Sequence, residues 1–170
     1  MTFLTLRFKK KNESGAVLTC VRTDGSVTST DIGRHGSFGP MHDLSHYAVE
    51  SRLGLSQGFL GLVAAGWDVE DFEQPGATAR LPDAAAWSEA IAGQLSIELG
   101  TGHHFALEDF NAGIRAGVGT RARGMTRVDV TADELAGCRR AVAELAGQWF
   151  ALTPGETLIL EFRPEPPEGP

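Results

Sequence analysis

Cysteine is scarce in this sequence. Only Cys20 and Cys138 are present among its 170 residues. Cys20 falls in a strand pattern and Cys138 on the apolar row of a helix, so we expect both to pack in the interior rather than to form a disulfide. This usage is typical of a protein from the reducing cytoplasm, and a cytoplasmic location is therefore expected.

Long hydrophobic runs and an excess of positive charge are also missing. The most apolar stretch, residues 53–67, is interrupted by polar residues and is too short to span a bilayer. The N-terminus has no charged region before an apolar core, so no signal peptide is expected. All the lysines lie together at 9–11, in a turn between two strands that we expect to be solvent-exposed. The formal net charge of −7 argues against general binding to nucleic acids or to membranes.

What remains is an ordinary globular composition. Hydrophobic residues at 42% and charged residues at 22% are typical of a soluble domain. A length of 170 residues suits one domain with a substantial core. We expect that domain to cover residues 1–163, and the Pro- and Glu-rich segment 164–170 to be a flexible tail. The partners left open are an unknown small-molecule substrate and a second copy of the chain.

Alternating apolar and polar residues predict four β-strands. The first lies within residues 3–8 and the second within residues 16–23. Asp24-Gly25 is a two-residue hairpin signal that leads into a third strand, within residues 26–32. A last strand is predicted within residues 156–163, and it is expected to pair with one of the first three.

Five helices are predicted between the third and fourth strands. The clearest begins after Thr131, whose spacing from Glu134 indicates a capping box. The segments expected to be helical are 40–53, 57–65, 82–99, 107–114 and 132–151. This order of elements indicates an α+β fold, in which a four-stranded antiparallel sheet packs against about five helices. Three of its strands come from the N-terminal part of the chain and one from the C-terminal part.

The first of these helices carries a candidate metal site. Pro40 suits the first turn of a helix, which makes Gly39 the expected N-cap. His42 and His46 are then spaced i and i+4 on one side, and Glu50 continues the row. Near the positive N-terminal end of a helix, histidine is expected to stay neutral, which is the form that binds metals. Imidazole and carboxylate groups bind divalent ions, zinc foremost, so His42, His46 and Glu50 are candidate ligands.

The segment His42-Asp43-Leu44-Ser45-His46 is similar to the H-E-x-x-H pattern of zincins, with Asp in place of Glu. In zincins the carboxylate between the histidines acts as the general base beside the metal. The similarity therefore implies that Asp43 is the catalytic base. Aspartate is one methylene shorter than glutamate, so its carboxylate reaches less far toward a bound water.

The wider segment Pro40–Phe72 resembles a group of uncharacterised small bacterial proteins. The resemblance rests on His42-Asp43-Leu44, His46-Tyr47, Val49-Glu50 and Gly58-Phe59-Leu60-Gly61-Leu62. It covers about a fifth of the chain and implies no known activity.

Two other groups of residues could contribute to a site. His35, His103 and His104 are the remaining histidines, and any of them could supply a further metal ligand from another element. Arg121 and Arg123 lie in a Gly-rich segment, where their guanidinium groups could hold an anionic part of a substrate. A surface loop is the alternative for both groups.

Two functions fit these observations. In the first, the chain is a divalent-metal hydrolase or lyase of the zinc type, which uses the row His42, His46 and Glu50. The ion would then lower the pKa of a bound water or polarise a carbonyl group. In the second, the chain is a non-catalytic soluble interaction or subunit module, and the histidines are structural residues bonded to carboxylates or to the backbone.

Overall fold

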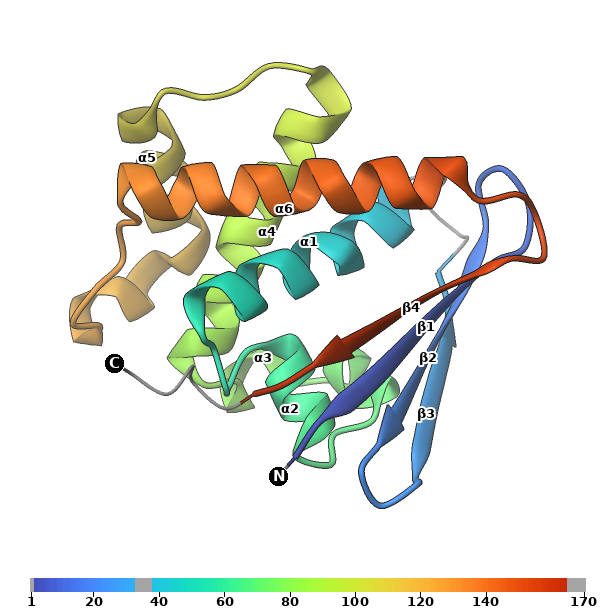
Figure 1. Ribbon diagram of the computed structural model, residues 1–170. Coiled ribbons are helices and arrows are strands. Elements are labelled where there is room, and N and C mark those ends of the chain that lie inside the picture. The colour runs from blue at the N-terminus through green and yellow to red at the C-terminus, as the bar shows by residue number, and fades with distance from the viewer. Residues whose placement is uncertain (1, 33–37, 165–170) are drawn as a thin grey trace, which may run out of the picture.

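The computed structural model describes residues 2–32 and 38–164, so most of the expected tail lies outside the described residues. The strands β1 (Leu4–Lys10), β2 (Ala16–Arg22), β3 (Val27–Asp31) and β4 (Thr157–Phe162) form one antiparallel sheet. Their order is β3-β2-β1-β4, with the C-terminal strand paired to β1 (Figure 1). The predicted α+β fold, with three N-terminal strands and one C-terminal strand, is confirmed.

Within these described residues, six α-helices lie on one side of the sheet (Figure 1). They are α1 (Phe38–Leu53), α2 (Phe59–Ala64), α3 (Ala77–Arg80), α4 (Asp83–Thr101), α5 (Leu107–Val118) and α6 (Ala132–Ala151). Two short 3₁₀-helices, η1 (Val69–Glu73) and η2 (Gly119–Gly124), lie outside the segments that were predicted to be helical. Helix α1 occupies the centre, where it packs against both α4 and α6.

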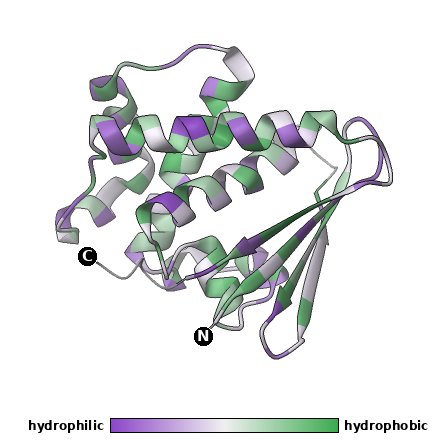
Figure 2. Ribbon diagram, viewed as in Figure 1, coloured by the Kyte–Doolittle hydropathy of each residue, from purple (hydrophilic) through white to green (hydrophobic). Residues whose placement is uncertain are grey.

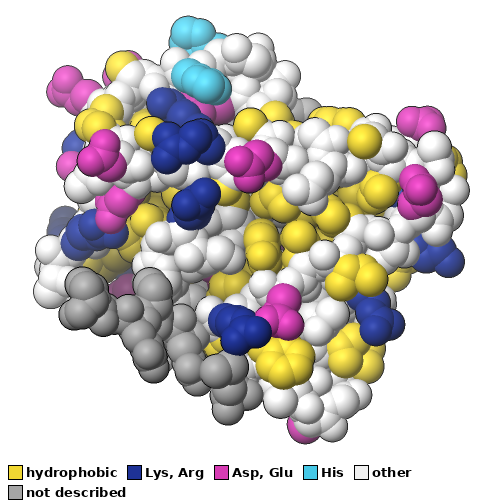
Figure 3. Space-filling view, viewed as in Figure 1, with side chains coloured by type: hydrophobic (Ala, Val, Ile, Leu, Met, Phe, Trp, Pro, Cys, Tyr) yellow, Lys and Arg dark blue, Asp and Glu magenta, His cyan; other side chains and the backbone are white. Residues whose placement is uncertain are grey.

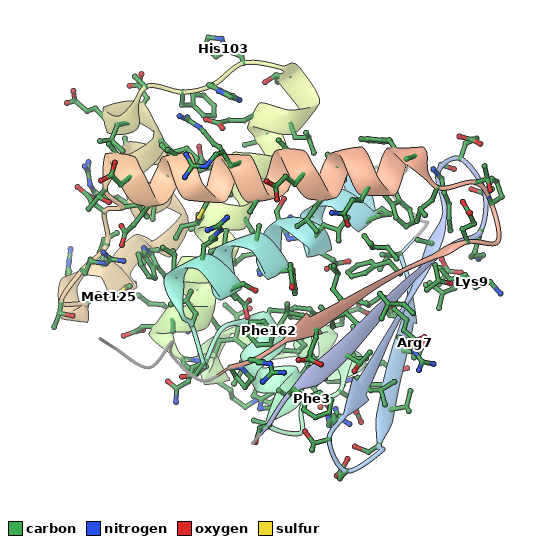
Figure 4. The ribbon with its side chains drawn as sticks, viewed as in Figure 1. Phe3, Arg7, Lys9, His103, Met125 and Phe162 are labelled. Carbon is green, nitrogen blue, oxygen red and sulfur yellow. The ribbon has the colours of Figure 1, made fainter. Side chains whose placement is uncertain are left out.

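The two faces of the sheet differ because side chains alternate along a strand. Leu4, Leu6 and Phe8 of β1 are fully buried against the helices. Figure 4 shows Phe162 on this inner side, whereas Arg7 and Lys9 point away from the helices. The helices are amphipathic in the same way, and Figure 2 shows hydrophilic and hydrophobic bands alternating along α6. The inner faces therefore meet in one hydrophobic core.

Helix α6 has the bounds that the sequence predicted. The Thr131 side chain accepts a hydrogen bond from the Glu134 backbone, and the Glu134 carboxylate accepts one from Thr131 in return. The capping box is thereby confirmed. Its apolar stripe is buried, as expected from the spacing of these residues: Leu135, Cys138, Val142, Leu145 and Trp149.

Several helix boundaries differ from the prediction; α5, for example, continues to Val118 instead of ending at residue 114. Helix α1 begins at Phe38, so Pro40 lies in its first turn but Gly39 is not the N-cap. Helix α4 runs past Gly100 and ends at Gly102, which adopts the left-handed conformation with φ of 70°. A glycine inside a helix was mistaken for its end because the two positions look alike in sequence.

Lys10 is buried, so the prediction that the whole basic turn faces solvent is wrong for this residue. Its side chain is 3% exposed, and it lies on the inner face of β1 with Phe8. The Lys10 Nζ donates to the carbonyl oxygens of Leu152 at 2.9 Å and Trp149 at 3.4 Å. A cation at this position satisfies carbonyl groups that the end of α6 leaves without helical partners.

The cysteines are packing residues. Cys20 and Cys138 are both buried and unbonded. Burial raises the pKa of the Cys20 thiol to about 12 and that of Cys138 to about 11, so neither is a reactive thiolate at neutral pH. In the described part of the chain, no helix combines the length and the apolar character needed to cross a membrane.

Candidate metal centre

The two histidines of α1 lie one above the other, as their spacing predicted. Their ring centroids are 4.9 Å apart, and both rings face α4. The carboxylate of Glu89 on α4 meets them there: Oε2 lies 2.7 Å from His46 Nε2 and 3.3 Å from His42 Nε2. Two imidazole nitrogens thus converge on a single carboxylate oxygen.

The hydrogen bonds on the far side of the His46 ring fix its tautomer. Its Nδ1 lies 3.2 Å from Glu50 Oε1 and 3.1 Å from Ser88 Oγ. Ser88 donates its own hydrogen to Glu50 at 2.9 Å, so its oxygen can only accept from the ring. Nδ1 must therefore carry a hydrogen, which directs the metal-binding lone pair of the neutral ring to Nε2.

The same reasoning applies to His42. Its Nδ1 lies 3.4 Å from Ser96 Oγ, which already donates to the carbonyl oxygen of Ala92 at 2.8 Å. Ser96 consequently accepts a hydrogen from Nδ1, and Nε2 is again the nitrogen that faces Glu89. Both histidines present the same nitrogen to the same carboxylate.

This group could hold a metal ion. One ligand atom each from His42, His46 and Glu89 lies within 4.8 Å of the others. The ligands of a tetrahedral zinc ion are roughly 3.3 Å apart, so only a small adjustment is needed. His42 and Glu89 have room for it, because their side chains are 35% and 61% exposed, whereas the His46 side chain is 4% exposed.

The charges of the cluster favour a cation at the convergence point. Burial lowers the pKa of His46, but the hydrogen bonds to Glu50 and Glu89 raise it by more than this. The resulting pKa is about 10. Hydrogen bonds from His42 and His46 hold the pKa of Glu89 well below its usual range. The expectation of a neutral histidine at the helix N-terminus therefore does not hold for His46, because two adjacent carboxylates outweigh the helix dipole. A divalent ion at this point would displace the proton from Nε2.

Glu50 is near the histidines but does not reach the convergence point. It is 1% exposed, and its Oε2 accepts from the backbone N–H of Leu60 at 2.9 Å and of Gly61 at 3.3 Å. A Cβ on Gly58 would lie 2.3 Å from the Glu50 carboxyl carbon, so only glycine fits beside it. Glu50 thus orients His46 through the ring nitrogen Nδ1, on the side away from the convergence point. The carboxylate at the convergence point belongs to Glu89, and not to Glu50 as the sequence had predicted.

Glu89 was missed because no short-range pattern joins it to the histidines. It lies on another helix, and only the packing of α1 against α4 brings the residues together. One signal was available: the neighbouring Ser88 and Ser96 are polar residues among the buried apolar residues of α4. Buried polar residues need partners, and each of these two serines contacts one of the histidines of α1.

Asp43 borders the cleft in front of the cluster. The cleft has a volume of about 990 Å³, and His42, His46 and Glu89 line it as well. Burial raises the pKa of Asp43 to about 6; the adjacent His46 and His42 limit this rise and Glu89 adds to it. No residue in the described ranges forms a hydrogen bond with its carboxylate. A carboxyl group that titrates near neutral pH can take up or release a proton.

The structure does not bring the other candidate ligands to this cluster. His103 and His104 are exposed in the connection between α4 and α5, and Figure 4 shows His103 pointing away from the helices. Histidine side chains are visible at the outer surface in Figure 3. His35 lies outside the described residues.

The candidate anion-binding arginines also lie away from the cleft. Arg121 donates to the carbonyl oxygens of Leu81 at 2.7 Å and Thr78 at 2.6 Å, and it pairs with Asp83 at 3.0 Å. These bonds tie η2 to the start of α4. Arg123 is exposed, and neither arginine lines the cleft.

Comparisons of the chain with protein families, curated proteins and solved structures find no match. Any function therefore has to be inferred from the residues themselves.

Proposed function

We propose that this chain is a metal-dependent enzyme, a hydrolase or lyase, in which His42, His46 and Glu89 hold one divalent ion. Zinc is the expected metal. The observation that carries this proposal is the convergence of two Nε2 atoms on Glu89 Oε2, while both Nδ1 atoms are engaged by acceptors. Two histidines and one carboxylate are the ligand set of many catalytic zinc sites and leave coordination positions open.

The surroundings of the cluster support catalysis. The ion would open onto the cleft, where it could lower the pKa of a bound water or polarise a carbonyl group. Asp43 borders the same cleft, and its raised pKa suits a group that accepts a proton from water and later returns it. Glu50 and Ser88 would act behind His46 as positioning residues.

One observation favours the alternative of a non-catalytic module with structural histidines. Both ring nitrogens of His46 already have protein partners, at 2.7 to 3.2 Å. A proton between His46 and Glu89 would complete this network without a metal. In that case α1 and α4 would simply be joined by buried hydrogen bonds.

Metal content separates the two functions. Protein purified without an affinity tag should contain, or take up after chelation, about one zinc ion per chain. His42→Ala, His46→Ala and Glu89→Ala should each lose the bound ion. His103→Ala and His104→Ala serve as matched controls, because they remove histidines that are exposed elsewhere, and they should retain it. Wild-type protein that takes up no divalent ion would contradict the proposal.

Catalysis is tested on a panel of chromogenic ester, amide and phosphoester substrates. Turnover should disappear on chelation and return with zinc. Asp43→Asn should keep the metal while losing most of the turnover, because it removes a proton acceptor and not a ligand. Turnover that survives chelation would assign the reaction to other residues.

A further inference from the structure

The cleft beside the candidate metal centre is lined by acidic side chains and, apart from the two histidines of that centre, by no basic residue in the described part of the chain. The carboxylates in its lining belong to Asp31, Asp43, Glu70, Glu73 and Glu89. The chain is rich in arginine, yet the described arginines and lysines all lie outside this lining. Clustered like charges around a cavity with apolar walls focus the electrostatic field and raise the local concentration of counter-ions.

Two of the five carboxylates are already compensated. Lys11 pairs with Asp31 at 2.5 Å, and Glu89 pairs with the two histidines. Asp43, Glu70 and Glu73 have no hydrogen bond or ion pair within residues 2–32 and 38–164. A divalent ion bound at Glu89 would offset only part of this charge. Among the described residues, the cleft lining consequently keeps a net negative charge with the metal in place.

An aromatic wall stands beside these carboxylates. Phe59 and Phe72 line the cleft, with ring centroids 4.5 Å apart, and Phe59 lies 5.4 Å from the His46 ring. Ile32, Val69 and Leu81 extend the apolar lining. Aromatic faces attract cations as well as apolar groups. The wall therefore suits a ligand that combines a positive charge with an apolar body.

From these observations we infer that the cleft binds a positively charged amine with an apolar portion, and that this is the substrate class of the proposed enzyme. The inference rests on the proposed function, since the metal centre opens onto the same cleft. It replaces the anionic substrate that Arg121 and Arg123 had suggested. The charged end lies against Glu70 and Glu73 of η1, and the apolar body lies against Phe59 and Phe72.

The test uses three small aromatic probes that differ in charge. Benzyltrimethylammonium is a cation that cannot coordinate a metal, benzyl alcohol is neutral and benzoate is an anion. Each is titrated into the zinc-loaded full chain and followed by calorimetry or by NMR shifts of the lining residues. The cation should bind about tenfold more tightly than the other two, as expected for one cation–π contact with added charge attraction. Its binding should weaken as the salt concentration rises.

A pair of double variants tests the assigned carboxylates. Glu70→Gln with Glu73→Gln should raise the Kd of the cation about tenfold. Glu13→Gln with Glu144→Gln removes the same charge from exposed positions outside the cleft, and this control should leave the Kd unchanged within about twofold. Equal binding of all three probes, or equal loss in both double variants, would overturn the inference.

Metal content measured on the same samples keeps the two proposals apart. Protein without metal but with a preference for the cation would contradict the metal-dependent enzyme and support the cationic ligand. Protein with metal but without that preference would contradict only the ligand class. Removal of zinc by chelation should tighten cation binding, because it takes positive charge out of the cleft.

Discussion

In the proposed metal site, Glu50 would orient a ligand without binding the metal itself. Replacing it with glutamine keeps its shape but removes the charge that holds the hydrogen of His46 on Nδ1. We expect Glu50→Gln to lower zinc affinity about 10- to 100-fold, as is typical for a partner of a metal-bound histidine. Calorimetric titration measures this change. Glu144 is an exposed glutamate on α6, and the control variant Glu144→Gln should retain the wild-type zinc affinity. An unchanged zinc affinity in Glu50→Gln would contradict the positioning role of Glu50.

The His46 imidazole predicts a pH dependence of the metal-free protein. Its pKa is about 10 in the folded state, against the usual 6.5 of the unfolded chain. The folded state thus binds the proton more tightly, and this stabilisation is complete below about pH 6.5 and lost as the pH rises toward 10. The free energy of unfolding of chelator-treated protein should therefore fall between about pH 7 and 9. Urea denaturation measures it.

Two neighbours titrate outside that window. Asp43, whose pKa is about 6, has released its proton by about pH 7, and Cys20 begins to matter only above about pH 9. A stability that stays level or rises between these limits would contradict the protonated His46–Glu89 pair. His103→Ala should behave like the wild type.

At the residue scale, the sequence predicted the histidine pair but not its carboxylate. Spacing i and i+4 places two side chains together through local geometry alone, and the close contact of His42 with His46 follows from it. Glu50 and Glu89 could not be told apart in this way. Their roles depend on how α1, α2 and α4 pack, which is long-range information.

At the scale of elements, the start of α2 and the end of α1 are locked together through Glu50. Gly58→Ala would place a methyl group against the Glu50 carboxylate, which cannot move without losing the bonds to Leu60 and Ser88. We expect a loss of about 1–3 kcal/mol in the free energy of unfolding, as for other overpacked cores, together with weaker zinc binding.

Gly147→Ala is the matched control for this substitution. Gly147 lies in α6, and a Cβ there would meet nothing within 4 Å. Alanine should therefore stabilise the protein by about 0.5–1 kcal/mol through its helix propensity. Chemical denaturation measures both changes in the free energy of unfolding, which should be a loss for Gly58→Ala and a gain for Gly147→Ala. A Gly58→Ala variant as stable as the wild type would mean that the Glu50 carboxylate is not held in place.

Most elements were predictable because their signals are local. The capping box at Thr131 and the hairpin at Asp24-Gly25 each specify structure within a few residues. Lys10 shows the limit of such reasoning. The sequence placed it in an exposed turn, whereas β1 continues to Lys10 and turns its side chain to the inner face. Its burial depends on the carbonyl groups at the end of α6, far along the chain.

At the scale of the whole molecule, β4 joins the C-terminal part of the chain to the N-terminal strands by pairing with β1. Phe162 is 1% exposed on its inner side, whereas Ile159 is 61% exposed on its outer side. Phe162→Ala should cost about 3–5 kcal/mol of stability, as expected for a large cavity in the core. Ile159→Ala on the same strand should cost less than about 1 kcal/mol. Equal losses in thermal or urea unfolding would contradict this sheet.

Titration of zinc into chelator-treated, tag-free protein tests the metal centre most directly. Calorimetry in buffers of different ionisation enthalpy gives both the number of ions and the number of protons released. Binding should saturate at about one ion per chain and release about one proton near pH 7.5, because the ion displaces the proton of His46. An absence of saturable binding, or binding that persists unchanged in His46→Ala, would contradict the site.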